Sequence, residues 1–432
     1  TFTAGKASSS AHVGSICLRG LDCNISGGDR DLAEYYSMAI DNEGMANIVY
    51  ASDVGTPGGT GFTFFSKQTA GASLYQPAPA PPPLTFKTPL LVDGARQGGE
   101  PSLNLDGNGN IFIGAIGSGA NLWKSSDGGA SFRFIKRFDE DQLENGGDVD
   151  LAIDKNNKVY LVDLTLPNAQ ISKSTDAGET WPQRSSAGEV NDRPWLATHG
   201  DNTVYLAYHD LTIETIIIEK STDGGLTWTK NLTGISDPTL LAETVPNTID
   251  GQIVVDQGDG TVYVIFNTSD NIANAKQPPF GILSNVYVAV SRDGGQTFSN
   301  YPVFRGWTQT VDPASAQTKG IAGQAGTNAG SIFPRLALDR DGNAYAVWAS
   351  NNTRNSSQNF DEFSIWLSRS TDKGKNWSTP VRVNQDNGTN VLPDISAGAA
   401  GQVVISWYST SAIGNPNTFA LNDPNVKWDV YV

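Results

Sequence analysis

Three arginines and a set of acidic residues stand at comparable places along this chain of 432 residues. Arg30, Arg193 and Arg335 each precede or begin a run of alternating apolar residues, in separate parts of the sequence. Guanidinium groups bind carboxylates in a bidentate manner, and grouped carboxylates bind divalent cations. The same places also carry Asp29, Asp31, Glu34, Tyr35, Tyr36, Glu100, Asp148, Asp150, Asp192, Asp250 and Asp394. If the fold brings these residues together, they form a charged site.

The elements that must position these residues are repeated. An apolar run, a tight turn rich in Asp, Gly and Asn, and a second run of β-branched and aromatic residues occur together seven times. Such runs are typical of strands, and such turns are typical of hairpins. The copies begin at Ser37, Pro101, Val149, Arg193, Gly251, Pro334 and Pro393. Each copy predicts the first two strands, a and b, of a repeated unit.

A second phrase, Ser-x-Asp-x-Gly-x-x-aromatic, follows five of these hairpins. Its copies begin at Ser125, Ser174, Ser221, Ser291 and Ser370. The Asp can accept hydrogen bonds from nearby backbone N–H groups and the Gly supplies a positive φ, so each copy predicts a turn between two further strands, c and d. In the first unit the segment from Gly61 to Gly71 stands where this phrase is expected.

The second phrase resembles the Asp-box of the sialidase-like superfamily, whose repeats are also called BNR repeats. Five full matches make the resemblance specific. It implies an all-β propeller, in which four-stranded antiparallel blades surround a central channel. It also implies that the boxes are structural turns on the face away from the ligand, through Asp127, Asp176, Asp223, Asp293 and Asp372.

Seven hairpin phrases predict seven blades in a single domain over residues 1–432. Six blades, as in catalytic sialidases, are the alternative. The chain ends in Trp-Asp-Val-Tyr-Val, as a strand of type c, and begins with Thr1-Phe2-Thr3, which resembles the end of a box. We therefore expect the N-terminal strand to complete the C-terminal blade and close the ring, which removes exposed sheet edges. The absent box between the two ends suggests a fragment of a longer chain.

Since strands alternate in direction, the a–b turns and the boxes must share one face. The b–c and d–a connections then share the other face, where strand a begins. We assign the long irregular segments to this second face, among them the Pro-rich stretch from Gln76 to Leu84. Long loops on a rigid scaffold are the usual place for binding, and solvated surface loops are the other interpretation.

One functional interpretation is an exo-glycosidase of sialidase type acting on acidic sugars. In that family three arginines hold the substrate carboxylate, a Tyr activated by a Glu is the nucleophile, and an Asp is the acid/base. The resemblance implies these roles for Arg30, Arg193 and Arg335, for Tyr35 or Tyr36, for Glu34 or Glu100, and for Asp29 or Asp31. The family's Arg-Ile-Pro motif before the first box is absent from this sequence, which weakens this interpretation.

The favoured interpretation is a non-enzymatic propeller that binds glycan or extracellular protein, or has a structural role. Its binding residues would be Asp148, Asp150, Asp192, Asp250 and Asp394, with Ca²⁺ as a candidate cofactor. A third interpretation is that the same charges form ion pairs between blades and cap the ends of strands. The sequence leaves these alternatives open.

Composition and cysteines bound the cellular context. The formal charge of −16 argues against nucleic acid as a partner. No apolar run is long enough to span a membrane. Cys17 and Cys23 are close in sequence and predict a local disulfide, which favours an oxidising compartment. We therefore expect an extracellular or cell-surface protein.

Overall fold

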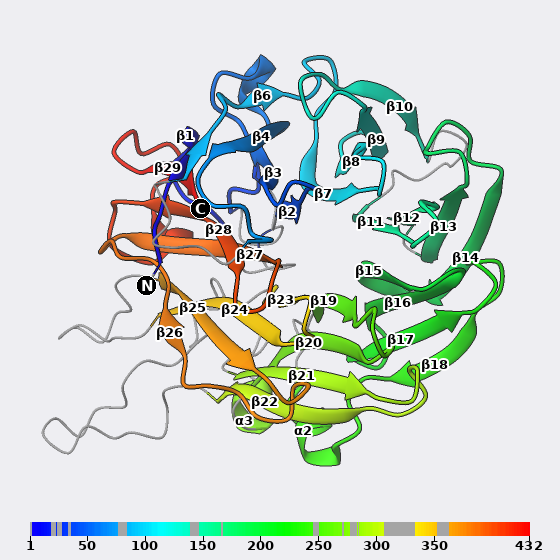
Figure 1. The fold of residues 1–432 in the computed structure, drawn as a ribbon. Coiled ribbons are helices and arrows are strands. Elements are labelled where there is room, and N and C mark those ends of the chain that lie inside the picture. Colours follow the sequence, from blue (N-terminus) through cyan, green and yellow to red (C-terminus); the bar gives the residue numbers. More distant parts are fainter. Residues whose placement is uncertain are drawn as a thin grey trace, which may run out of the picture.

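Seven antiparallel sheets surround a central axis in the computed structural model (Figure 1). It describes residues 2–18, 23, 28–32, 36–76, 84–138, 147–165, 167–244, 250–269, 272–276, 283, 285–305, 333–351 and 363–432. The chain is a seven-bladed β-propeller, as the seven hairpin phrases predict, and the six-bladed alternative is wrong.

Each blade begins with strand a at the axis and continues outward through strands b, c and d. The first blade contains β2 (Ser37–Ile40), β3 (Ala46–Ser52), β4 (Phe62–Ala70), β5 (Thr85–Phe86) and β6 (Leu90–Leu91). The second and third contain β7 (Gly99–Leu105), β8 (Ile111–Ile116), β9 (Ala120–Ser125), β10 (Arg133–Arg137), β11 (Val149–Ile153), β12 (Val159–Leu164), β13 (Asn168–Ser174) and β14 (Gln183–Glu189).

The remaining blades have the same order. The fourth and fifth contain β15 (Asn191–His199), β16 (Thr203–Asp210), β17 (Thr215–Ser221), β18 (Thr229–Thr233), β19 (Asp250–Val255), β20 (Val262–Thr268), β21 (Asn285–Ser291) and β22 (Ser299–Arg305). The sixth and seventh contain β23 (Arg335–Leu338), β24 (Ala344–Asn351), β25 (Phe363–Ser370), β26 (Val381–Arg382), β27 (Thr389–Ala397), β28 (Val403–Thr410), β29 (Lys427–Tyr431) and β1 (Lys6–Val13).

The N-terminal strand β1 is the outermost strand of the seventh blade, so the prediction of ring closure is confirmed (Figure 1). It pairs antiparallel with β29, and Lys6 lies opposite Tyr431. Gly5 and Val432 exchange two backbone hydrogen bonds of 2.8 and 2.9 Å just beyond this pair. Phe2 packs against the apolar cluster that contains Tyr431.

The core lies between neighbouring blades. Alternate residues of one strand face opposite neighbours: Val262 and Val264 of β20 pack against the fourth blade, whereas Tyr263 and Ile265 pack against the sixth. Both faces of a blade are therefore apolar, which explains why the b strands read as continuous apolar runs.

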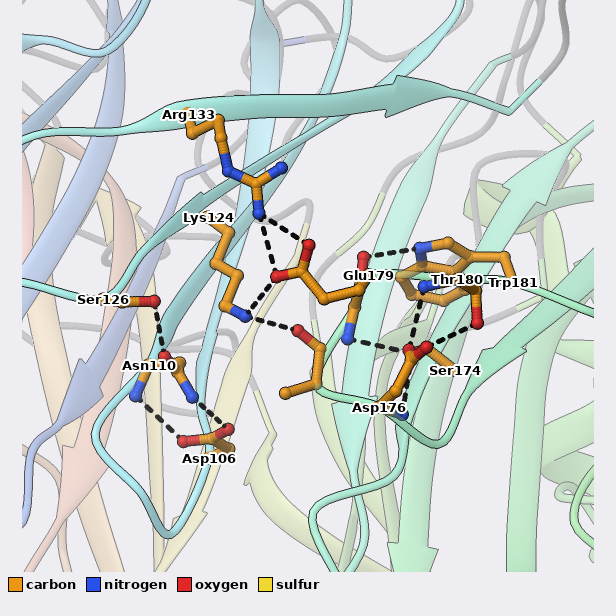
Figure 2. A network of polar contacts seen from close by, with 12 residues as sticks. Asp106, Asn110, Lys124, Ser126, Arg133, Ser174, Asp176, Glu179, Thr180 and Trp181 are labelled. Atoms are coloured by element: carbon orange, nitrogen blue, oxygen red, sulfur yellow. Dashed lines mark hydrogen bonds and ion pairs between the residues drawn. The ribbon is translucent and has the colours of Figure 1, made fainter.

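The a–b and c–d turns lie on one face, which we name the box face. Each of the five boxes has the same hydrogen bonds. The Ser hydroxyl donates to the Asp carboxylate at 2.7–2.8 Å and accepts from the N–H of the Gly two residues after that Asp at 2.8–2.9 Å. Figure 2 shows the third-blade box, where donation by the Thr180 hydroxyl and N–H and by the Ser174 hydroxyl lowers the pKa of Asp176 to about 2.

In two blades a lysine ties the box to an earlier blade. Lys124 of β9 donates to the Ala177 carbonyl at 2.7 Å and to Glu179 at 2.9 Å in the third-blade box (Figure 2). Lys220 of β17 donates in the same way to the Gly294 carbonyl of the fifth-blade box, at 2.7 Å. The boxes are therefore joined to one another around this face.

The first blade departs from the sequence expectation. The segment from Gly61 to Gly71 contains strand c itself, β4, and the Pro-rich stretch lies between β4 and β5 in the c–d connection. Before this stretch, Leu74 bonds to the a–b turns of two blades, through Gly44 at 2.9 Å and Ala399 at 2.7 Å. Residues 77–83 lie outside the described residues.

The b–c and d–a connections lie on the opposite face, which we name the loop face. It carries the short helices α2 (Pro238–Ala242), which Asp237 caps, and α3 (Ile272–Ala275), and the 3-10 turns Pro57–Gly59 and Pro416–Thr418. None of the helices described could cross a lipid bilayer. Cys17 and Cys23 form the predicted disulfide in the connection that follows β1.

Candidate binding site in the central channel

A cavity of 290 Å³ lies on the axis, between the innermost strands of the first six blades. Apolar side chains such as Leu103 and Leu151 alternate in its wall with groups that form hydrogen bonds. The polar side chains of the wall are Ser37, Ser102, Asn104, Asp150, Thr198, Gln252, Gln257 and Arg335.

One position of strand a recurs around this channel, four residues before the Asp or other residue that opens each a–b turn. We name it the ring position. Its occupants, from the first blade to the seventh, are Ser37, Ser102, Asp150, Trp195, Gln252, Arg335 and Asp394.

Four ring positions bond to the blade that follows. In each case the side chain accepts a hydrogen bond from the backbone N–H of the residue after the next ring position. The pairs are Ser102 with Leu151 at 3.2 Å, Asp150 with Leu196 at 2.8 Å, Gln252 with Leu336 at 3.2 Å, and Asp394 with Met38 at 2.6 Å. Strand a has one edge without a neighbouring strand, and these side chains satisfy donors along it.

Arg335 and Asp394 form a buried ion pair, with 2.8 Å between Arg335 Nε and Asp394 Oδ1. Arg335 Nη1 also donates to the Gly251 carbonyl of the fifth blade at 3.0 Å. Asp394 bonds to the first blade through Met38. The pair therefore joins four blades at the axis.

Arg193 and Arg335 come from different blades, and both guanidinium groups pack on the ring of Trp195. The distances to the ring centroid are 3.7 Å for Arg193 and 4.5 Å for Arg335, which is the range of a cation–π contact. Arg193 is buried, and its guanidinium donates to the Val149 carbonyl at 3.4 Å. Its backbone N–H donates to Asp148 at 3.1 Å. The structure thus brings two of the three candidate arginines together.

Asp150 is a buried carboxylate that interacts electrostatically with Arg193. Its burial raises its pKa, and the charge of Arg193 and the N–H of Leu196 oppose that rise. Ser102 donates to its other oxygen at 2.7 Å. Both carboxylate oxygens of Asp150 therefore accept a hydrogen bond.

The third candidate arginine, Arg30, is held at a different place. Its guanidinium lies 3.6 Å from Glu100 Oε1, and Glu100 is buried while Arg30 is 28% exposed. Asp29 interacts with His12, with 3.7 Å between Asp29 Oδ2 and His12 Nε2. Asp31 donates its backbone N–H to the carboxylate of Asp29.

Tyr36 is buried, with its ring edge against Tyr408 at a centroid distance of 5.0 Å. Burial raises the pKa of its hydroxyl well above the ordinary value. Asp192 is half-buried in β15. Glu34, Tyr35 and the side chain of Asp250 lie outside the described residues.

Three of the carboxylates proposed as Ca²⁺ ligands already have hydrogen-bond donors from the protein. Asp148, Asp150 and Asp394 each accept hydrogen bonds from backbone or side-chain donors. Within the described ranges, no three His, Cys, Asp or Glu side chains are placed to hold one metal ion.

Sequence reasoning missed a backbone feature that shapes the mouth of the channel. Four residues two places before a ring position have left-handed backbone and precede a proline: Glu100, Arg193, Phe333 and Leu392, with φ of 45°, 50°, 55° and 52°. In three of these blades the register between strands a and b shifts at this point. The signal was the recurrence of Pro101, Pro194, Pro334 and Pro393 at one place in the repeat.

Comparisons with known proteins give the fold and no closer relationship. No family model matches the chain, and no curated protein sequence matches it. A fungal alcohol oxidase of the AA5 family, solved with copper, is 11% identical with a TM-score of 0.54, over 99% of this chain and 74% of that one. At this identity the likeness concerns the overall fold alone.

Two further solved structures have lower TM-scores. A protein of unknown function from Dyadobacter fermentans is 12% identical over 99% of both chains, with a TM-score of 0.45. A leech intramolecular trans-sialidase is 14% identical over 92% of this chain and 67% of that one, with a TM-score of 0.43. We draw no functional argument from either.

Proposed function

We propose that this chain is a non-catalytic propeller that binds a neutral glycan in its central channel. The observation that carries the proposal is the composition of the channel wall, in which amide and hydroxyl groups alternate with aliphatic side chains. The volume of 290 Å³ stands at the lower limit of ligand pockets, which measure about 300–1,000 Å³. This size suits one or two sugar rings.

Gln252 supplies one candidate donor in the wall. Its carbonyl oxygen accepts from Leu336, and its half-buried amide nitrogen has no hydrogen bond to the residues that the structure describes. A sugar hydroxyl could accept from this nitrogen. The charged groups are already neutralised by partners, as in the pair of Arg335 and Asp394, which favours an uncharged ligand over an acidic sugar.

We place the protein outside the cytoplasm as part of this proposal, either secreted or at the cell surface. The disulfide between Cys17 and Cys23 supports this location, because disulfides persist in oxidising compartments. The net charge of −16 argues against nucleic acid as a partner. The proposed binding does not require Ca²⁺, so we expect the melting temperature to be unchanged in EGTA.

The second candidate is an exo-glycosidase of sialidase type. The meeting of Arg193 and Arg335 on Trp195 favours it, because paired guanidinium groups can bind a substrate carboxylate. Against it, Arg335 is occupied by Asp394, and Tyr36 has a raised pKa that makes it a poor nucleophile at neutral pH. Turnover of a fluorogenic sialoside that Arg335→Lys abolishes would establish this candidate instead.

The proposal is tested on an array of neutral and sialylated glycans, followed by calorimetry with any glycan that binds. Gln252→Glu keeps an oxygen that can accept from Leu336 and replaces the amide donor with a second, charged oxygen. We expect it to weaken binding at least about tenfold, the effect of about 1.4 kcal/mol. Gln296→Glu, the same change of charge on the box face, is the control. No binding to any neutral glycan, or equal binding by Gln252→Glu, would overturn the proposal.

A further inference from the structure

Exposed apolar side chains are concentrated on the loop face. Ten large hydrophobic residues are exposed in the part of the chain that the structure describes, and eight of them lie in b–c or d–a connections. The two exceptions are Leu226 in a box and Val381 in β26. A bias of this kind marks a surface that contacts another molecule.

Three of these residues form one patch on the fourth blade, which we name the blade-4 patch. Val190, Leu211 and Ile213 are 43%, 40% and 60% exposed. The N–H of Leu211 donates to the carbonyl of Val190 at 3.0 Å, so the two connections are in direct contact. Asp210 fixes the second connection by accepting from the N–H groups of Thr212 and Ile213. The apolar side chains are therefore presented by ordered turns.

Val190 carries backbone strain that the fold does not require of a valine. It is the single residue between β14 and β15, and its φ is 46°. A β-branched residue is rare in this left-handed region, where glycine has no steric cost. Two backbone bonds hold the conformation, one of them from its own N–H to Pro167 at 3.1 Å. An exposed valine at such a position indicates that its side chain has a use on the surface.

The surroundings of the blade-4 patch are acidic. Residues 189–192 and 210–214 contain Glu189, Asp192, Asp210 and Glu214 and no Lys or Arg. Glu214 is exposed next to Ile213. A second copy of this chain, with its charge of −16, would bring like charges together at such a surface. A partner with apolar groups between cationic ones is complementary in both respects.

We propose that the blade-4 patch is a docking site for a protein segment in which aliphatic side chains are flanked by Lys or Arg. The aliphatic side chains cover Val190, Leu211 and Ile213, and the cations lie against the acidic rim. This site is separate from the channel, so it holds or fails independently of glycan binding.

The test uses fluorescently labelled peptides and measures their binding by anisotropy. The probe is a short peptide of alternating Leu and Lys, compared with one in which Ser replaces Leu and one in which Glu replaces Lys. We expect only the first to bind, with an affinity that falls as salt is raised. Binding by the Ser peptide equal to that of the Leu peptide, or no binding by the Leu peptide, overturns the proposal.

Matched variants locate the site. Leu211→Ser with Ile213→Ser removes two exposed apolar groups and should weaken the Leu–Lys peptide by about tenfold or more. Leu226→Ser on the box face is the control, because Leu226 is 55% exposed, close to Ile213 in exposure. An equal loss of peptide affinity in Leu226→Ser would contradict the assignment of the site to the blade-4 patch. Binding of the wild type to neutral lipid vesicles that these two substitutions abolish would assign the patch to membranes instead.

Val190→Gly separates a docking role from a structural one. Glycine relieves the left-handed strain, so the melting temperature should rise. The loss of the side chain should weaken binding of the Leu–Lys peptide. A structural role for Val190 predicts the opposite: a lower melting temperature with unchanged peptide binding.

Discussion

The box face and the central channel both depend on carboxylates that accept hydrogen bonds, but the partners differ in their distance along the chain. The bonds of Asp223 in its box span two to four residues. The bonds of Asp394 at the axis span 59 and 356 residues. A box is a self-contained turn that can be repeated, whereas a ring position forms its bond only when the next blade is in place. The same chemistry therefore gives a local unit on one face and a connection between blades on the axis.

The difference predicts that the axis is the more sensitive region. Asp394→Ala should lower the free energy of unfolding by about 3–5 kcal/mol, because Arg335 is left buried without its counter-charge. The midpoint of urea unfolding measures this. Asp394→Leu combined with Arg335→Met removes both charges and should recover much of the loss. A double variant as unstable as the single one would show that the charge is not the cause.

The connection between the seventh and first blades should depend on pH. His12 Nδ1 lies 2.8 Å from Asp53 Oδ2, and its Nε2 lies 2.8 Å from the Ser15 carbonyl. Both partners only accept, so both ring nitrogens donate and the imidazole is charged. Burial alone would lower the pKa of His12, but the bond to Asp53 and the charges of Asp53 and Asp29 raise it above the ordinary 6.5.

This stabilisation is complete below pH 6.5 and is lost as the pH rises through the raised pKa in the folded state. A charge-assisted hydrogen bond contributes about 1.5–3 kcal/mol, which sets the expected effect. Melting temperatures of wild type and His12→Gln, measured from pH 6 to alkaline pH, should converge as the pH rises through the raised pKa of His12. Parallel curves would contradict the charged state of His12.

Loss of one box should have a smaller and uniform effect. Asp223→Ala leaves turn donors that water can replace, so we expect a cost of about 1 kcal/mol, as for the loss of a helix cap. Asp293→Ala should cost the same within experimental error, because its bonds are equivalent. If either variant is as unstable as Asp394→Ala, the contrast between the two regions is wrong.

The smallest effect is expected for a cation between boxes. Lys220→Met removes the bond to Gly294 and the contact with the ring of Tyr205, whose centroid lies 5.4 Å from Lys220 Nζ. Its aliphatic stem is replaced by one of similar size, so the cost should be about 0.5–1 kcal/mol. Thermal unfolding at low and high salt measures it. A cost that disappears in salt would show that charge attraction, and not the hydrogen bond, is responsible.

The sequence predicts the parts of this molecule that are local and repeated. Ser-x-Asp-x-Gly encodes a complete set of bonds, and the hairpin phrases give the number of blades. Ser102 and Gln252 were missed because an ordinary Ser or Gln gains its role only from the N–H of the next blade. The ion pair of Arg335 with Asp394 could not be predicted for the same reason, because its partners come from different blades. The first blade follows the repeat least closely, because its c–d connection is long and has no box.

The pairing of β1 with β29 has a consequence for how the protein is made. Within this chain β1 is synthesised before the strand that it pairs with, so the ring of blades cannot close until β29 has followed. Until then, the edge of β1 that pairs with β29 has no partner and can pair with another strand. The same pairing between two copies of the chain would exchange their first strands and give a domain-swapped dimer.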